Sequence, residues 1–472
     1  MKAEGWRLQT KQAHYHFFMQ ENPVSETIDQ VAAFIEAGCV PLDTGHSCGT
    51  LDAAEAILAA HPEVATASIY TAAILGDAVA VQRFLDLDPR NVSAKSGPRD
   101  WDALTHLCFS RYLRLDRFRS DGFVGAARAL LVAGASANTG FYWGSHQPEP
   151  GFESVLYGAA GAAHHPELTH LLLERGADPN DGEVAYHAPE GYDNSALELV
   201  VASGKLNDDS LATMLGRKHD WHDYEAIKFL LDHGADPNRI TRWGRTALHQ
   251  AVLRDNAMQI FEALLDHGAD PTIVAGGRSP VSTAARRGRG DVLDLFEQRG
   301  FPVELHGVER LIGACARNDS PLVHSLAGAD PRLVEEMLAE GGKLLAEFAG
   351  NGNADGVRLL LDLGLEVTAV HREGDGYFGI AQNSTALHVA AWLNRPAVVN
   401  ILIERGAPVN EPDGQGRTPL ALAVRACVDS HWTGRRSPEC VRALLLAGAS
   451  VSGVSFPSGY AEVDELLRAA GA

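Results

Sequence analysis

The chain of 472 residues has few aromatic residues and no long apolar run. Phe, Trp and Tyr together make up 7% of the sequence. No stretch approaches the roughly 18 consecutive apolar residues that a membrane-spanning helix needs. The first residues also lack the apolar segment of a signal peptide. We therefore expect no membrane association and a cytoplasmic location, with export as a host-directed effector by a specialised secretion system left open.

Cysteine is also scarce, and its spacing is irregular. The six cysteines are scattered along the chain, and no two of them form a C-x-x-C pair. Such a pattern is typical of reduced, mostly buried thiols in a cytosolic protein. It argues against a disulfide framework or a zinc-binding module, and we expect no cofactor.

Positive charge is in deficit. The formal net charge is −21 and the sequence pI is about 5.3. Proteins that bind nucleic acid need a basic stripe along the phosphate backbone, so this balance argues against nucleic acid as a partner. An acidic protein is soluble and attracts basic surfaces, which favours a partner with a basic patch.

Two short sequences recur at a fixed spacing. GADPN stands at 176–180 and 234–238, and GADPT stands at 268–272 after a further step of 34 residues. Each copy directly follows a Leu-rich segment. A second signature, TALH, stands at 246–249 and 385–388, and TPL at 418–420. Self-similarity at a period near 33 indicates a stack of structural repeats.

Each position of this unit has a physical reason. Thr246 can cap a first helix, and His249 follows one turn later, where an imidazole can join its own turn to a neighbouring one. Gly234 supplies the left-handed residue that ends a second helix, and Pro237 prevents the helix from restarting. One helix pair cannot bury its apolar face alone, so the copies must stack into a solenoid.

This sequence resembles the ankyrin-repeat family, whose unit is a turn followed by two antiparallel helices. The resemblance implies an all-α fold, an ankyrin-repeat solenoid of about a dozen helix-turn-helix units with an irregular N-terminal cap and inserted loops. It further implies a stand-alone multi-repeat protein of bacterial type and a monomer. Family members use a concave face, built from the turns and first helices, to bind other proteins.

The repeat signals divide the chain into five segments. We expect irregular capping helices at 1–62, degenerate repeats at 63–138, clear repeats with a long loop (139–153) at 139–305, degenerate repeats with a loop (371–382) at 306–382, and C-terminal repeats with a cap at 383–472. The glycines that end second helices are spaced more widely around the two loops. Insertions of this kind are where a solenoid carries its individual function.

The two loops and the neighbouring turns are rich in aromatic residues, which are frequent in binding hot spots. We expect the turns of successive repeats to line one groove that binds a partner protein. The residues predicted to contact it are Tyr142, Trp143, His146, Tyr186, His187, Arg242, Trp243, Tyr377 and Phe378. The alternative is that these aromatic side chains pack on adjacent turns.

The preferred function is therefore a non-catalytic scaffold that binds a partner protein along its groove and finger loops. The competing class is an enzyme or a small-ligand binder, in which the loops at 139–153 and 371–382 fold over a pocket in the same groove. No complete catalytic set is present in the sequence, so we name no catalytic residue.

Two further motifs have a chemical and a structural interpretation. GHSCG at 45–49 matches the nucleophile elbow of α/β-hydrolases, but no strand precedes it, so we expect a turn between repeats. His219 and His222 are spaced so that they can share a helix face and bind a metal with Asp220 or Asp223. We prefer the other interpretation, in which both histidines lie in a helix link and Asp223 caps the next helix.

Overall fold

The clear repeats begin at threonines that cap their first helices. In this computed structural model, Thr246 and Thr385 each form a capping box with the histidine three residues later. The amide of Thr246 donates to Nδ1 of His249 at 3.3 Å, so the imidazole proton lies on Nε2. That Nε2 donates to the carbonyl oxygen of Arg278 in the next repeat at 2.9 Å. The prediction that this histidine joins two turns is confirmed.

The second helices of the clear repeats end at glycines in the left-handed region, and in three repeats an asparagine then joins the turn to the next one. Gly234 has φ 90° and Gly268 has φ 84°, values that favour glycine. The side chain of Asn238 donates to the carbonyl oxygen of Gly268 at 2.8 Å and accepts from the amide of Asp270 at 2.7 Å. Asn138 and Asn410 make the same two bonds in their repeats. These bonds fix the spacing of successive turns.

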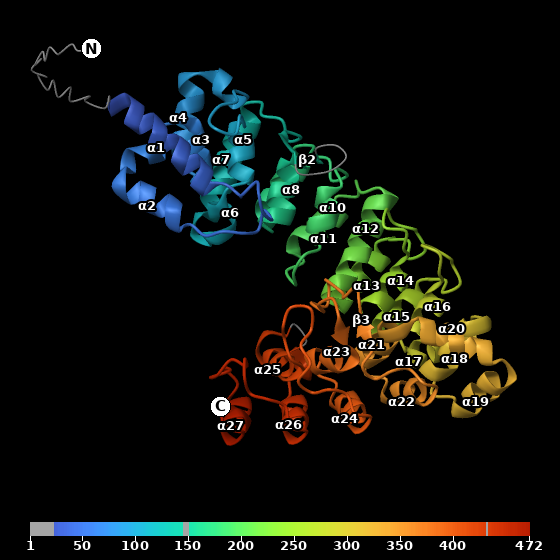
Figure 1. The fold of residues 1–472 in the computed structure, drawn as a ribbon. Helices are drawn as coiled ribbons and strands as arrows, with labels where there is room; N and C mark the ends of the chain where they lie inside the picture. The colour runs from blue at the N-terminus through green and yellow to red at the C-terminus, as the bar shows by residue number, and fades with distance from the viewer. Residues whose placement is uncertain (1–22, 145–150, 431–432) are drawn as a thin grey trace, which may run out of the picture. The chain divides into compact units, whose positions relative to one another are not determined.

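The structure describes residues 23–144, 151–430 and 433–472 (Figure 1). The chain forms two compact units, unit 1 (Met1–Leu206) and unit 2 (Asn207–Ala472). The boundary between them falls inside the segment 139–305 that the sequence grouped together. Among the described residues, no helix has the length and apolar character needed to cross a membrane.

Unit 1 is a stack of short helix pairs with one β-ribbon. Its elements are α1 (Pro23–Gly38), α2 (Asp52–Ala60), η1 (Pro62–Thr66), α3 (Ile69–Ile74), α4 (Ala78–Leu87), η2 (Pro89–Val92), α5 (Ala103–Cys108), α6 (Arg111–Leu115), η3 (Arg117–Arg119), α7 (Ser120–Val132), β1 (Gly140–Trp143), β2 (Gly151–Ser154), α8 (Val155–Tyr157), η4 (Gly158–Ala162), α9 (Pro166–Glu174), α10 (Glu183–His187) and α11 (Ser195–Ala202). Helix α1 packs against both α2 and α3, so α1 and α2 form a pair of their own.

Unit 2 continues the same pattern. Its elements are α12 (Asp208–Lys218), η5 (His219–Trp221), α13 (Tyr224–Asp232), α14 (Ala247–Leu253), α15 (Met258–Asp266), α16 (Pro280–Arg286), α17 (Gly290–Gln298), α18 (Gly307–Ala316), α19 (Ser320–Ala329), α20 (Pro331–Ala339), α21 (Gly341–Asn351), α22 (Ala354–Asp362), β3 (Val370–His371), β4 (Ser384–Thr385), α23 (Ala386–Trp392), α24 (Pro396–Glu404), α25 (Pro419–Asp429), η6 (Thr433–Arg435), α26 (Glu439–Leu446) and α27 (Ala461–Ala469). The predicted all-helical repeat fold is confirmed.

Each predicted loop is framed by a short antiparallel ribbon. Strand β1 pairs with β2 from Gly140 opposite Ser154 to Trp143 opposite Gly151, and β3 pairs with β4. The sequence predicted insertions here but no strands. The ribbons hold the two ends of each loop at a fixed separation on the turn side of the repeats.

Ion pairs join distant repeats in unit 2. The carboxylate of Asp255, which follows α14, lies within 3.1 Å of the guanidinium groups of Arg289, Arg395 and Arg435. Gly290 allows a close approach nearby, since a Cβ there would lie 2.2 Å from the carbonyl oxygen of Ala316. One carboxylate thus contacts arginines from three segments that connect first and second helices and lie far apart in the sequence.

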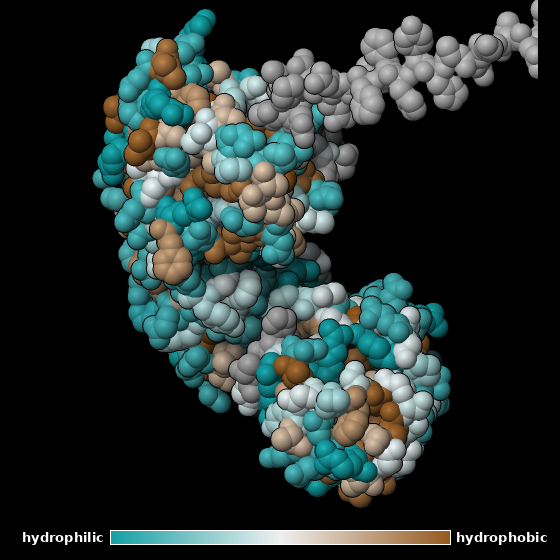
Figure 2. All heavy atoms as spheres, turned by 90° about the vertical axis from the view of Figure 1, so that its left-hand side faces the viewer, coloured by the Kyte–Doolittle hydropathy of each residue, from teal (hydrophilic) through white to brown (hydrophobic). Residues whose placement is uncertain are grey.

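The core of both units consists of small and branched apolar side chains, mainly Ala, Leu, Val and Ile. The face drawn in Figure 2 is mostly hydrophilic, with separate apolar patches on it. This distribution fits the acidic composition, because charged residues gather at the surface while Leu and Ala fill the interior.

Candidate binding surfaces

Strand β1 of unit 1 carries two predicted contact residues that point in different directions. Tyr142 is 72% exposed, and its ring lies 5.2 Å from that of Phe152 on β2. The ring of Trp143 instead lies 4.6 Å from the imidazole of His46, and its Nε1 donates to the carbonyl oxygen of Leu42 at 2.8 Å. Tyr142 is therefore placed to contact a partner, whereas Trp143 holds the segment around His46.

Helix α10 of unit 1 carries Tyr186 and His187 side by side. The carboxylates of Glu183 and Glu190 lie 3.3 Å and 3.1 Å from the imidazole of His187. Burial alone would lower the pKa of His187, but these carboxylates raise it to about 9. His187 is thus a cation at neutral pH. His146, another residue of the predicted set, lies outside the described residues.

Unit 2 presents an apolar and cationic patch on two successive turns. Trp243 is 43% exposed, and the guanidinium of Arg242 lies 4.5 Å from its ring centroid. Ile240 on the same turn and Val274 on the next are 49% and 65% exposed. We call Ile240, Arg242, Trp243 and Val274 the turn patch. Such a group of exposed aliphatic, aromatic and arginine side chains is typical of a protein-binding surface.

The prediction for Phe378 is wrong. Its side chain is only 4% exposed and belongs to a cluster with Val389 and Trp392 of α23. Tyr377 packs against that cluster, its hydroxyl donates to the carbonyl oxygen of Asp220 at 2.7 Å, and Arg254 lies over its ring at 3.8 Å. The loop has an apolar core to fill, which the sequence did not reveal, so these rings fasten the loop to the repeats.

His219 and His222 are part of a hydrogen-bonded link around Asn256. Nδ1 of the fully buried His219 lies 2.6 Å from Oδ1 of Asn256, and the Asn256 amide nitrogen lies 3.0 Å from Nδ1 of His222. Asp223 accepts a hydrogen bond from the amide of Ala226, so the predicted helix cap is confirmed. No three His, Cys, Asp or Glu side chains among the described residues are grouped to hold a metal ion.

The GHSCG segment forms a turn, and its histidine is buried. The amide of Cys48 donates to the carbonyl oxygen of Gly45 at 2.8 Å. The sheets of the described residues are two antiparallel ribbons, so no parallel sheet precedes Ser47 as a nucleophile elbow requires. Nδ1 of His46 lies 2.9 Å from the hydroxyl of Tyr157 and 3.9 Å from the carboxylate of Glu153.

Glu153 is a buried acidic residue that belongs to no recognisable sequence motif. It lies on β2, and burial, followed by the negative charge of Glu183, raises its pKa to about 8. Burial also raises the pKa of nearby Asp181 to about 6. Unit 1 therefore holds carboxyl groups that are partly protonated at neutral pH.

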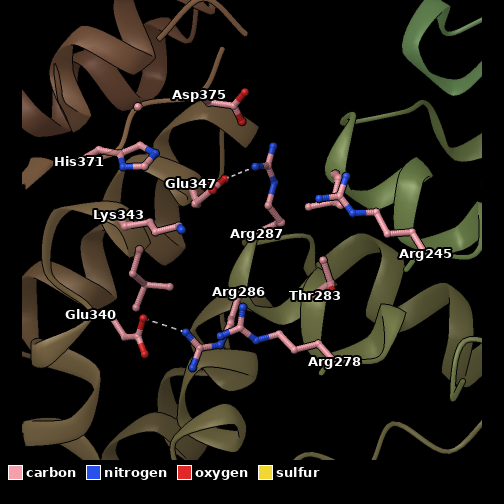
Figure 3. A pocket seen from close by; sticks show the side chains of 13 residues that line it. Arg245, Arg278, Thr283, Arg286, Arg287, Glu340, Lys343, Glu347, His371 and Asp375 are labelled. Carbon is pink, nitrogen blue, oxygen red and sulfur yellow. Dashed lines mark ion pairs between the residues drawn. The ribbon is translucent and has the colours of Figure 1, made fainter. Parts of the chain in front are cut away.

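Unit 2 contains a cavity of about 360 Å³ under the loop that follows β3 (Figure 3). Figure 3 shows arginines entering from one side and Lys343 and His371 from the other. The complete lining is Arg245, Leu253, Arg278, Thr283, Arg286, Arg287, Glu340, Lys343, Leu344, Glu347, His371, Gly374 and Asp375. The lining is thus locally cationic in a protein of net charge −21.

Acidic residues neutralise only part of this charge. Arg286 pairs with Glu309 at 2.6 Å and with Glu340 at 2.9 Å, and Arg287 pairs with Glu347. Burial alone would lower the pKa of Arg286, but its bonds to the two glutamates raise it. Lys343 pairs with Glu373 outside the cavity at 2.8 Å.

Two of the cavity arginines could have been paired from the sequence. Arg245 and Arg278 occupy the same repeat position, directly before the residue that caps a first helix. Lys343 and His371 come from a degenerate repeat and an insertion, where no motif fixes their position. Packing of α21 against α16 and β3 brings them to the arginines.

Stacked helix pairs joined by projecting turns define a helical repeat protein. The chain contains ankyrin repeats. A sequence model described as ankyrin repeats (3 copies) matches residues 218–302 and 311–413. The relatives described next come from an insect, a fungus and a plant, so the bacterial source stays a prediction.

Similar curated proteins share parts of this chain. The transient receptor potential cation channel subfamily A member 1 of Drosophila melanogaster is 26% identical over 44% of this chain and 17% of the channel. The ankyrin repeat domain-containing protein SAT10 of Stachybotrys chartarum is 28% identical over 59% of this chain and 14% of its own. Serine/threonine-protein kinase 12 of Arabidopsis thaliana is 36% identical over 18% and 17% of the two chains.

The chain therefore spans less than a fifth of the length of these relatives. Among solved structures, the human ASB11 ankyrin repeat domain is 22% identical and covers 50% of this chain and 98% of its own, with a TM-score of 0.22.

Proposed function

We propose that this protein is a non-catalytic scaffold that binds a partner protein through the turn patch of unit 2, with Tyr142 and Tyr186 of unit 1 as further contacts. Ankyrin repeats generally mediate protein–protein interaction. The observation that carries the proposal is the exposure of Ile240, Trp243 and Val274 on neighbouring turns. Burying large apolar side chains is the main source of affinity at such surfaces.

The local charge of unit 2 favours an acidic partner segment. Arg242 belongs to the turn patch, and Arg245 and Arg278 follow on the same two turns. At physiological salt, charges are screened beyond about 8 Å, so nearby arginines outweigh the net charge of the whole chain. We therefore replace the expected basic partner with a segment that carries an apolar side chain next to acidic residues.

Several coarser expectations accompany this proposal. We propose a monomer that acts in the cytoplasm and does not bind nucleic acid. The six cysteines are free thiols, five of them buried, which is compatible with a reducing compartment.

Site-specific photo-crosslinking in the native cell tests the turn patch. A photoreactive amino acid at position 243 is expected to capture a defined partner protein. Leu446 is the matched control position, because it is an exposed apolar residue (84%) of unit 2 on the second helix α26. The same set of captured proteins at both positions would rule out the turn patch as the binding surface.

The cavity of unit 2 favours small-ligand binding as a second candidate function. The loop that follows β3 lines a space of about 360 Å³, whereas the competing interpretation of the sequence placed both loops over one pocket. Pockets of this size are typical of sites for small molecules.

A further inference from the structure

We propose that the cavity of unit 2 binds a phosphomonoester group, held by Arg245, Arg278, Arg287 and His371. This site lies in the cavity and shares the turns of Arg245 and Arg278 with the turn patch, but its binding does not depend on a partner protein.

Two arginines at the cavity wall have guanidinium groups that are available to a ligand. The side chains of Arg245 and Arg278 make no ion pair and no hydrogen bond with the described residues, and both residues are exposed. Partial burial, followed by the positive charge of Arg254, lowers the pKa of Arg245 from its usual value. Arginine nevertheless keeps its charge in proteins. Two guanidinium groups therefore stand at one cavity with their donors available.

Two buried nitrogen atoms also line the cavity. Arg287 is 7% exposed and His371 is 4% exposed, and both line the space. Nε of Arg287 and Nδ1 of His371 are buried and have no hydrogen-bond partner within the described part of the chain. A buried donor without a partner costs free energy, so such atoms point to a ligand that completes them.

The donor set fits a phosphoryl group. Guanidinium groups bind phosphate through paired N–H donors, and a phosphomonoester offers three oxygens to several donors at once. Burial lowers the pKa of His371, so the imidazole is neutral at neutral pH and can donate from Nδ1 to one oxygen. Glu340 and Glu347 are already paired with Arg286 and Arg287, and Oδ1 of Asp375, the third carboxylate of the lining, accepts hydrogen bonds from two backbone amides.

The cavity wall is held in place before a ligand arrives. Oδ1 of Asp375 accepts hydrogen bonds from the amides of Tyr377 and Phe378, and the amide of Asp375 donates to the carbonyl oxygen of Ile380. The buried ring of Phe378 then fastens this loop to the core. A site fixed in this way loses little conformational entropy when it binds.

Isothermal titration calorimetry on the full chain at constant ionic strength tests this site. The probes are inorganic phosphate, a sugar phosphate and a phosphoserine peptide, with the unphosphorylated peptide as the control ligand. We expect at least one phosphorylated probe to bind and the control peptide not to bind. The tightest probe identifies whether the phosphoryl group comes from a small molecule or from a protein segment.

Paired variants separate this site from general charge effects. The double variant Arg245→Ala/Arg278→Ala is expected to weaken binding at least about tenfold, because two charge-assisted contacts are lost. The matched control is Arg358→Ala/Arg442→Ala, which removes the same charge from exposed second helices of unit 2. No binding by any phosphorylated probe, or equal weakening in the two double variants, would overturn the proposal. Loss of the crosslink at position 243 would leave this result unaffected.

Discussion

The two units bury charge in opposite ways. Unit 1 encloses carboxyl groups, and burial raises the pKa of Glu153 to about 8 and that of Asp181 to about 6. Unit 2 instead encloses arginines that pair with carboxylates, three of them on Asp255. A buried acid with a raised pKa makes stability depend on pH, whereas a buried ion pair makes it depend on both partners. The same repeat thus supports two different kinds of interior.

The two ribbon-framed loops show a second difference. Both insertions precede a first helix and carry aromatic residues. The ribbon of unit 1 leaves Tyr142 exposed, while the loop of unit 2 places Phe378 in an apolar cluster and frames the cavity. Both loops place one aromatic side chain in the core, since Phe141 of unit 1 is 8% exposed and its ring stacks on that of Trp101 at 4.2 Å, and they differ in which further ring stays at the surface.

The largest effect is expected at Asp255. Substitution Asp255→Ala leaves Arg289 and Arg395 partly buried without this carboxylate. It should lower the free energy of unfolding by about 4 kcal/mol, as when one partner of a buried pair is removed. Chemical denaturation measures the change. Asp362→Ala, which removes an exposed partner of Arg405, is the control and should cost less than about 1 kcal/mol. Equal costs would show that Asp255 does not join the repeats.

The next effect contrasts the two loops. Phe378→Ala should cost about 3 kcal/mol, because it leaves a space beside Val389 and Trp392. The corresponding exposed residue of unit 1, Tyr142, should cost less than about 0.5 kcal/mol when changed to Ala. Denaturation midpoints of both variants measure this contrast. A small loss of stability for Phe378→Ala would show that its side chain does not pack in the core.

The contributions of Glu153 and His187 to the pH dependence of stability should have a definite sign. Because folding raises the pKa of Glu153 from 4.5 to about 8, the folded state holds a proton that the unfolded state releases. The contribution of Glu153 to stability should therefore fall as the pH rises from about 5 to 8, by at most about 1.4 kcal/mol per pH unit. His187, whose pKa is raised from 6.5 to about 9, loses its contribution in the same direction as the pH rises toward 9.

Calorimetric unfolding between pH 5 and 9 measures this dependence. Glu153→Gln should flatten the slope below pH 8 and leave the part that belongs to His187. An unchanged slope in this variant would mean that Glu153 is ionised in the folded state.

The smallest effect on stability is expected in the turn patch. Trp243→Ala should change the free energy of unfolding by less than about 0.5 kcal/mol, since Trp243 is a surface residue of a turn, 43% exposed and outside the core. The same variant should weaken partner binding, and Leu446→Ala should change neither quantity. A large loss of stability for Trp243→Ala would indicate a packing role instead of a binding role.

Much of the fold could be predicted from the sequence, because the signals were local. Thr246, His249 and Gly234 act within one repeat or on its neighbour, and their caps, turns and bonds are as expected. The position of Asp223 as a cap followed from the same local reasoning. Helix pairs and inserted loops could therefore be located without knowledge of tertiary contacts.

The sites were harder to predict, because their residues meet only through packing. Tyr377 reaches Asp220 across 157 residues, and the cavity joins Arg245 to His371. No spacing rule in the sequence connects such positions. Aromatic residues in an insertion suggest contact residues, but Phe141 of the first loop and Phe378 of the second are buried.

Hydrogen–deuterium exchange of the chain with and without its captured partner tests the central claim most directly. Binding of the partner is expected to slow amide exchange mainly in the turns at 239–245 and 272–278, which carry Ile240, Trp243 and Val274. Slower exchange confined to the second helices, such as α24 and α26, with unchanged turns, would contradict it.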